Sequence, residues 1–352
     1  MRLVPVRSRI IALYGVLGAA NVLAWVWAAA AFHGDAVLLG TALLAYTFGL
    51  RHAVDADHIA AIDNVTRKLM QEGQRPVAVG FFFSLGHAAV VALAVAAVAL
   101  TAGALQDRFA AFRAVGGLIG TGVSVSFLFA MAVVNLFVLA SVYRRFRAMR
   151  SGSGLAVAGL DDDLDRRGIL ARLCRPLFRL IRRSWHMFPL GFLFGLGFET
   201  ATEIALLGIA ADAARQQPIG SIMVFPALFA AGMTLIDSTD SVLMVGAYGW
   251  AFVKPIRKLY YNLIITAVSV VVALVVGGIE ALGLVADRLS LDSPFWAYVA
   301  LLNRDFGRLG YLIIAIFIAS WALSALVYRL KGYDDIEAPN EAAAAPAQDS
   351  RR

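Results

Sequence analysis

Long runs of uncharged residues are the feature that most limits how this chain can fold. A helix that crosses a bilayer needs about 20 largely apolar residues in succession, and the 352-residue chain contains eight runs of suitable length. Only 16% of its residues are charged, whereas a soluble domain carries about 25%. We therefore expect an all-α polytopic membrane protein with eight transmembrane helices. The expected spans are 10–32, 36–64, 77–105, 114–143, 187–211, 219–253, 259–286 and 309–328.

The basic residues are distributed unevenly over the loops between these spans. If the amino terminus is cytoplasmic, 24 of the 31 lysines and arginines fall in cytoplasmic segments and 6 in outer loops, with Arg51 inside a span. Lysine and arginine accumulate on the cytoplasmic side of membrane proteins, so we expect both termini in the cytoplasm. The same distribution accounts for most of the net charge of +7, and no nucleic-acid partner is expected.

A basic loop at 144–186 separates two halves of four spans each, 1–143 and 187–330. Residues 169–183 of the loop place leucines and isoleucines among arginines, which is typical of an amphipathic helix on the membrane surface and equally compatible with a solvated loop. The Ala- and Pro-rich tail at 331–352 is expected to be disordered and cytoplasmic. The first run has no small-residue cleavage site and is expected to remain in the mature protein.

The second span contains six titratable side chains between Phe48 and Val65. A charge at the centre of a bilayer costs about 2.5 to 3.5 kcal/mol on insertion scales, so this cluster needs a partner, a cavity or a ligand. We therefore interpret it as a functional site. Its members are Arg51, His52, Asp55, Asp57, His58 and Asp63.

Histidine and aspartate dominate this cluster, and a histidine of the third span is a candidate to join it, although a single histidine in a span more often only bonds to another helix. Imidazole nitrogen with carboxylate oxygen suits nickel, cobalt or zinc better than magnesium or calcium. The single cysteine, Cys174, offers no thiolate cluster. The expected metal ligands are His52, Asp55, Asp57, His58 and His87.

The spacing of these residues conflicts with a straight helix. At about 100° per residue, Asp55 and the two histidines of the second span share one face, but Asp57 points away from it. Either the helix is unwound near Gly49, or Asp57 faces another span and Arg51 pairs with a carboxylate.

The two halves of the chain carry similar short segments. Residues 48–50 and 194–196 both read Phe-Gly-Leu, and Phe83 and Phe229 each lie 35 residues beyond the first phenylalanine of these segments. Since the second span runs inward and the fifth outward, spans 2–4 and 5–7 would form an inverted repeat, as in many secondary transporters. Chance similarity between apolar segments is the alternative. The repeat predicts one site shared by the second, third, fifth and sixth spans.

Four segments together resemble the signature motifs of the nickel/cobalt transporter family (NiCoT). They are 51–59, with its His-x-x-x-x-Asp-His core, 81–87, 196–203 and 232–240. The resemblance implies high-affinity uptake of nickel(II), cobalt(II) or both across the bacterial cytoplasmic membrane. It also implies that His52, Asp57 and His58 are essential for handling the ion, and that His87 affects selectivity. Departures from the family pattern leave the preference between nickel and cobalt open; they are Ala88, Ala89, Glu199 and Ser238.

Acidic residues of the fifth and sixth spans are candidates for the part of the ion pathway on the inner side of the second-span cluster. Glu199 with Glu203, and Asp237 with Asp240, are spaced to share a helix face. They are candidates for residues that orient the ligands, for later metal positions or for proton carriers. The expected pathway residues are Arg51, Glu199, Thr200, Thr202, Glu203, Asp237, Thr239 and Asp240.

We therefore expect a secondary transporter rather than an enzyme, with nickel or cobalt as the transported substrate, no cofactor, and the lipid bilayer as the surrounding partner. The sequence has no Gly-rich phosphate loop with a lysine, so no ATP-binding domain is expected in this chain. Efflux of the same metals is one alternative, although the central loop holds a single histidine, His186, at its edge. A membrane-embedded metalloenzyme is the other; five histidines are few for a desaturase, and the protease motif His-Glu-x-x-His is absent.

Overall fold

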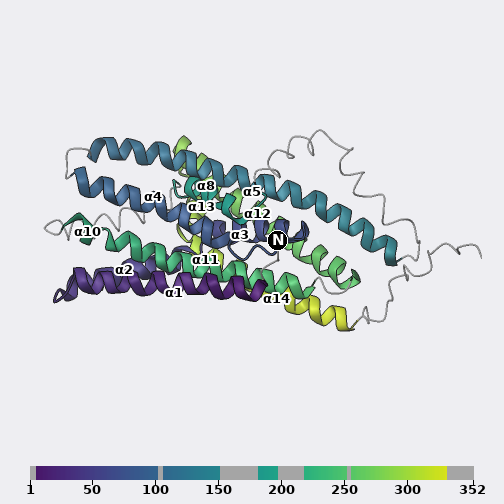
Figure 1. Cartoon of the computed structure of the whole chain (residues 1–352). Coiled ribbons are helices and arrows are strands. Elements are labelled where there is room, and N and C mark those ends of the chain that lie inside the picture. Colours follow the sequence, from purple (N-terminus) through teal and green to yellow (C-terminus); the bar gives the residue numbers. More distant parts are fainter. Residues whose placement is uncertain (1–4, 102–105, 151–180, 197–217, 252–254, 331–352) are drawn as a thin grey trace, which may run out of the picture.

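The computed structural model describes residues 5–101, 106–150, 181–196, 218–251 and 255–330, and all regular elements in these ranges are helices (Figure 1). Most of the long helices run side by side in one bundle. In chain order the elements are α1 (Val6–Ala31), α2 (Ala36–His52), α3 (Ala56–Gln71), α4 (Val79–Thr101), α5 (Gln106–Arg150), the 3₁₀-helix η2 (Ser184–His186), α8 (Met187–Phe194), α10 (Ile219–Ile222), α11 (Val224–Ala251), α12 (Pro255–Leu289), α13 (Pro294–Arg304) and α14 (Phe306–Leu330).

Six helices in the described ranges are long and apolar enough to cross a membrane, and α2 with α3 adds a seventh if this bent pair is one span. The chain is therefore an all-helical, multi-pass membrane protein. Of the fifth expected span, 187–211, only α8 and the two residues after it are described. Residues 197–211, most of the basic loop and the tail at 331–352 lie outside the described residues, so the expectations for them stay predictions.

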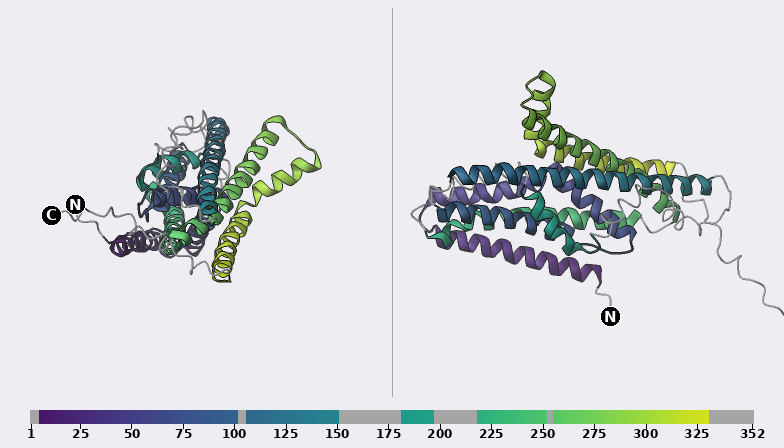
Figure 2. Two further views of the ribbon diagram at one scale, coloured as in Figure 1. Left: turned by 90° about the vertical axis from the view of Figure 1, so that its right-hand side faces the viewer. Right: turned by 90° about the horizontal axis from the view of Figure 1, so that it is seen from above.

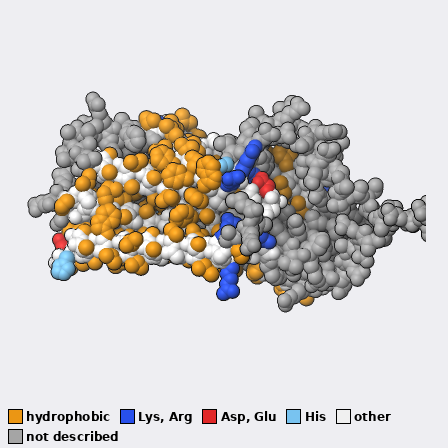
Figure 3. Space-filling view, viewed as in Figure 1, with side chains coloured by type: hydrophobic (Ala, Val, Ile, Leu, Met, Phe, Trp, Pro, Cys, Tyr) orange, Lys and Arg blue, Asp and Glu red, His pale blue; other side chains and the backbone are white. Residues whose placement is uncertain are grey.

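The side of the bundle drawn in Figure 3 is covered largely by hydrophobic side chains, and lysine and arginine side chains gather toward one end of it. Val22, Leu23 and Val26 of α1 are each more than half exposed, as is Leu243 of α11. A continuous apolar surface of this size suits contact with lipid.

Two elements differ from the sequence-based expectation. The second span is not one continuous helix, because α2 ends at His52, α3 begins at Ala56, and the two axes are bent by 52°. The break lies at 53–55, so the helix is interrupted as one of the two alternatives required, but one turn after Gly49 rather than at it. In addition, the expected loop between the last two spans contains α13, which begins at Pro294, a residue whose fixed φ suits the first turn of a helix.

The charges around the break favour helix ends at these positions. Arg51 and His52 lie in the last turn of α2, and Asp57 lies in the first turn of α3. The helix dipole stabilises cations at the carboxyl end and anions at the amino end, each by about 0.3–1 kcal/mol at exposed sites. Asp55 precedes α3 in an extended conformation, with φ −67° and ψ 148°. The residues of the predicted site therefore also end one helix and start the next.

The crossing of α2 and α11 is close enough that only glycine fits at the contact. A Cβ on Gly49 would lie 2.1 Å from the carbonyl oxygen of Phe229, and a Cβ on Gly232 would lie 2.7 Å from that of Tyr46. Gly49 thus permits close packing of α2 on α11 rather than unwinding of α2.

The crossing of α4 and α8 has the same construction. A Cβ on Gly191 would lie 1.9 Å from the carbonyl oxygen of Phe83, and a Cβ on Gly86 would lie 2.0 Å from that of Phe188. In all four helices the glycine comes three residues after the aromatic residue whose carbonyl is approached. Two helix pairs therefore share one packing motif, aromatic-x-x-Gly against aromatic-x-x-Gly.

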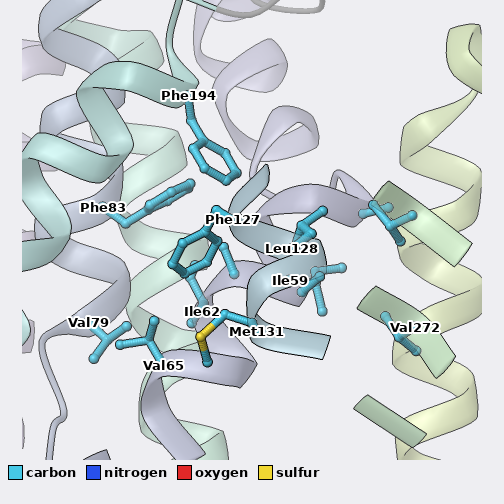
Figure 4. Close-up of a cluster of buried hydrophobic side chains, with 14 of the residues drawn as sticks. Ile59, Ile62, Val65, Val79, Phe83, Phe127, Leu128, Met131, Phe194 and Val272 are labelled. Carbon is cyan, nitrogen blue, oxygen red and sulfur yellow. The ribbon is translucent and has the colours of Figure 1, made fainter. Parts of the chain in front are cut away.

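Helix α3 lies at the centre of the bundle, and all its residues from His58 to Met70 are buried. Its apolar face packs into a cluster with side chains of α4, α5, α8 and α12 (Figure 4). Members of this cluster include Ile59, Ile62, Val65, Phe83, Phe127, Leu128, Phe194 and Val272. Away from this core, the turn between α12 and α13 stands apart from the other helices (Figure 2).

Candidate metal centre

Three histidines from three helices meet inside the bundle. His52 is the last residue of α2, His58 lies in the first turn of α3, and His87 lies on α4. One ring nitrogen of each lies within 4.8 Å of the other two, and the ring centroids are 4.8–4.9 Å apart. The side chains are almost fully buried, with exposed fractions of 2%, 0% and 1%. We call these three residues the histidine cluster.

The break between α2 and α3 brings the first two histidines into the cluster. His52 and His58 belong to different helices whose axes differ by 52°. The 100° per residue of a continuous helix therefore does not fix the angle between their side chains. The residues between them turn the chain through backbone hydrogen bonds, from the N–H of Val54 to the carbonyl of Arg51 and from the N–H of Asp55 to that of His52, each 3.0 Å long.

Two of the histidines have a carboxylate behind the ring. The Nδ1 atom of His52 is 2.9 Å from Oδ2 of Asp55, and the Nδ1 atom of His58 is 3.1 Å from Oδ2 of Asp237 on α11. A carboxylate at Nδ1 fixes the proton there, leaves Nε2 as the electron-pair donor and raises its basicity. Nε2 of His58 has no hydrogen-bond partner among the described residues. The His58–Asp237 hydrogen bond leaves Nε2 of His58 available to bind a metal, and the Asp55 carboxylate close to Nδ1 of His52 favours the same role for Nε2 of His52.

The distance between two of the three histidines is compatible with binding to one transition-metal ion. The Nε2 atoms of His52 and His87 are 3.0 Å apart. Two nitrogens at right angles around an ion, each at the 2.0–2.1 Å usual for imidazole ligands, would be about 2.9 Å apart. Imidazole ligands suit nickel, cobalt and zinc. The cluster could therefore hold one such ion with little movement of His52 and His87.

Asp57 lines the same cavity as His52 and His87, and its Oδ1 atom has no hydrogen-bond partner among the described residues. Its side chain is only half-buried because it borders this cavity. Asp55, by contrast, lies behind His52 and can orient it. Of the two geometries left open by the sequence, the structure has a break, and that break turns Asp57 toward the cavity.

The remaining predicted pathway residues have different surroundings. Arg51 is exposed, and its Nη2 atom and Oδ1 of Asp55 lie 3.3 and 3.2 Å from where a Cβ on Gly307 of α14 would sit. Thr239 accepts a hydrogen bond from Tyr14 of α1 at 3.0 Å and so faces α1. Asp240 has a buried Oδ2 atom without a hydrogen-bond partner in the described part of the chain. Glu199, Thr200, Thr202 and Glu203 lie outside the described residues.

A second buried polar group surrounds Asp63, for which the sequence indicated no role beyond membership of the titratable cluster. Asp63 accepts hydrogen bonds from the hydroxyl of Tyr248 on α11 and, at 2.6 Å, from that of Ser269 on α12. Nε of Arg67 lies 4.0 Å from its Oδ2 atom. We call these four residues the Asp63 network; it ties α3 to α11 and α12.

Two further polar side chains near the centre were missed by the sequence reasoning. Ser84 on α4 donates a hydrogen bond to Oδ2 of Asp237, the atom that also pairs with His58. Glu280 on α12 is 8% exposed, lines the cavity and accepts a hydrogen bond from Ser124 at 2.7 Å. A signal for Glu280 was available, because it is the single charged residue of the run 259–286. No signal distinguished Ser84 from other span serines.

Comparison with known proteins agrees with this geometry. Residues 38–327 match the family described as high-affinity nickel-transport protein. A high-affinity nickel transport protein of Cupriavidus necator is 59% identical over 332 residues, which cover 94% of this chain and 95% of the relative. The hydrogenase nickel incorporation protein HupN of Bradyrhizobium diazoefficiens is 53% identical over 318 residues, covering 90% of this chain and 83% of the relative.

A cobalt transport protein, NhlF of Rhodococcus rhodochrous, is 41% identical over 336 residues, which cover 94% of this chain and 93% of the relative. No solved structure matches the chain at a significant level. The family match extends over most of the chain, and all three identities are high over nearly full lengths. The chain therefore belongs to the family of high-affinity nickel-transport proteins.

Proposed function

We propose that this protein is a secondary transporter that carries nickel(II), cobalt(II) or both into the cell, and that it is not an enzyme. The observation that carries the proposal is the meeting of three buried histidines at a break in a membrane-spanning helix pair. The names of the relatives, two for nickel and one for cobalt, support these substrates. The metal ligands are His52, His58 and His87, with Asp57 as a further oxygen ligand from the cavity.

The proposed location is the bacterial cytoplasmic membrane, with both termini in the cytoplasm. The distribution of lysine and arginine over the loops supports this orientation. The turn between α12 and α13 then belongs to the outer side, and the hydrated ion enters the cavity there. It exchanges water for Asp57 and the imidazoles, and continues inward past Asp237 and Asp240.

The Asp63 network would close the pathway on the inner side of the histidine cluster. Arg67 is 1% exposed, and a buried guanidinium repels an approaching cation. Inward release then requires α3 to move relative to α11 and α12, which breaks the hydrogen bonds of Asp63 with Tyr248 and Ser269.

An inverted repeat offers a way to make such a movement. The α2–α11 and α4–α8 crossings are built in the same way. This supports an equivalence of α2 (second expected span) with α8 (fifth), and of α4 (third) with α11 (sixth). The crossings pair Gly49 with Gly191, whereas the two Phe-Gly-Leu segments pair Gly49 with Gly195, which lies about one helical turn further along the chain. Alternating access would proceed by rocking of one crossing against the other.

The membrane potential suffices as a driving force for uptake. A doubly charged ion that moves inward gains about 4.6 kcal/mol per 100 mV, from about 2.3 kcal/mol for each elementary charge. This corresponds to a concentration ratio above a thousandfold, at about 1.4 kcal/mol per factor of ten.

Accumulation of radiolabelled nickel and cobalt in bacterial cells that express the chain tests the proposal. Uptake predicts more label than in vector cells, and loss of the excess when the membrane is depolarised. Less label than in vector cells would instead indicate efflux. Equal label, with the protein present in the membrane, would contradict transport of these metals and favour a metalloenzyme.

A further inference from the structure

A single cavity connects the histidine cluster to the turn between α12 and α13. Its volume is about 780 Å³, and His52, Asp57 and His87 form one part of its wall. The rest of the wall comes from α5, the end of α12, the following turn and α13, with Phe194 of α8 and Phe306 of α14. The cavity is large enough for a hydrated ion, so it can hold the ion before the imidazoles bind it.

Glu280 is the buried charge of this cavity wall that the histidine cluster does not explain. Its side chain is 8% exposed, and a carboxylate at this depth in a span is unfavourable unless a partner compensates it. Within the described part of the chain it forms no ion pair, and its hydrogen bond from Ser124 comes from a neutral hydroxyl. A cation in the cavity would compensate such a carboxylate.

Asp57 faces the same cavity with one oxygen unpaired in the described structure. Glu280 lines the same cavity, so one divalent cation in it could be shared by the two carboxylates. The mouth of the cavity adds the exposed Asp287 and Asp292, which attract cations, and one opposing charge, Arg304. Acidic residues thus extend from the mouth to the histidines.

We propose that Glu280 and Asp57 form a second divalent-cation site in this cavity, one step before the histidine cluster, with Asp57 as a ligand common to both sites. This inference rests on the proposed transport function. Carboxylates hold a hydrated dication largely through oxygen and water, whereas the imidazoles need the ion to lose water. Two successive sites let an ion enter readily and still move on, because no single site must both capture and release it.

A purely structural role for Glu280 makes a different prediction. In that case its contribution is the hydrogen bond that joins α5 to α12, and Glu280→Gln, which can still accept from Ser124, should behave like the wild type. Ser124→Ala would then be the harmful variant. The proposed site predicts the opposite order, because Glu280→Gln removes the charge while Ser124→Ala leaves it.

Initial uptake rates over a range of nickel concentrations separate these roles. Glu280→Gln should raise the half-saturating nickel concentration about tenfold, with Glu280→Asp and Ser124→Ala closer to the wild type. Asp305→Asn is the matched control, because it removes one carboxylate that pairs with Arg308 at 3.0 Å and lies outside the cavity wall. An unchanged half-saturating concentration in Glu280→Gln would overturn the inference.

Nickel binding to the purified protein gives an independent reading. We expect one tight and one weak site in the wild type, only the tight site in Glu280→Gln, and only the weak site in His58→Ala. A weak site that survives in Glu280→Gln would overturn the inference even if Glu280→Gln transports poorly. Wild-type cells that accumulate no metal would contradict the proposed transport function instead, whatever the binding result.

Discussion

His58 and Asp237 are paired deep inside the bundle, with 3.1 Å between Nδ1 of the imidazole and Oδ2 of the carboxylate. Both side chains are almost completely buried. The pair joins α3 to α11 and leaves Nε2 of His58 without a hydrogen-bond partner among the described residues. In the proposed metal site, Asp237 would therefore act on the metal through the orientation and basicity of His58.

Replacing Asp237 tests this indirect role. Asp237→Asn keeps a hydrogen-bond acceptor but removes the negative charge, so we expect nickel affinity to fall about 10- to 100-fold. Ser84→Ala removes a donor to the same carboxylate and should have a smaller effect. Equilibrium binding to the purified variants measures both. Leu243→Ala, a 65% exposed position on the same helix, is the control; an Asp237→Asn affinity equal to that of the control would contradict the assignment.

The glycine contacts give a prediction about folding. Gly49→Ala and Gly191→Ala each place a methyl group about 2 Å from a backbone carbonyl oxygen of the facing helix, and overpacking of this kind costs about 1–3 kcal/mol or more. We expect both variants to unfold at lower temperature in detergent. Gly246→Ala and Gly278→Ala, where nothing lies within 4 Å, should match the wild type. Equal unfolding temperatures for Gly49→Ala and Gly246→Ala would contradict the close approach of α2 to α11 at Gly49.

The Asp63 network gives a prediction about stability and closure. Tyr248→Phe removes one of the donors to Asp63, and leaving a buried carboxylate short of a partner costs about 1–3 kcal/mol. The thermal unfolding temperature of the purified variant should therefore fall. Tyr311→Phe is the control, because Tyr311 is 59% exposed on α14. If Tyr248→Phe is as stable as Tyr311→Phe, the network does not stabilise the closed arrangement.

Part of the site could be predicted because its chemistry is visible in the local sequence. Histidines and aspartates inside an apolar run are costly in a membrane unless a ligand or partner compensates them, so His52, Asp57 and His58 were predictable as a group. The position of the break was not, because Gly49 looks like a weak point but is used for packing on Phe229. The charged residues at the end of α2 and the start of α3 favour a break at 53–55 instead.

Contacts between distant segments were beyond local sequence reasoning. The spacing of Asp237 and Asp240 predicted a shared face, but the choice of Asp237 as the partner of His58 depends on how α11 packs on α3. Helix α13 was missed because it is short and lies between two spans, where a loop was expected. Glu280 was visible as an isolated charge, yet only the cavity connects it to the histidine cluster.

Nickel binding to purified wild type and His58→Ala tests the central claim, that the histidine cluster holds the ion, most directly. His33→Ala is the matched control, since His33 is an exposed histidine just after α1 and outside the cluster. We expect tight binding in the wild type and His33→Ala, and a loss of at least about tenfold in His58→Ala with an unchanged size-exclusion profile. Tight binding of nickel by a folded His58→Ala protein would contradict the account.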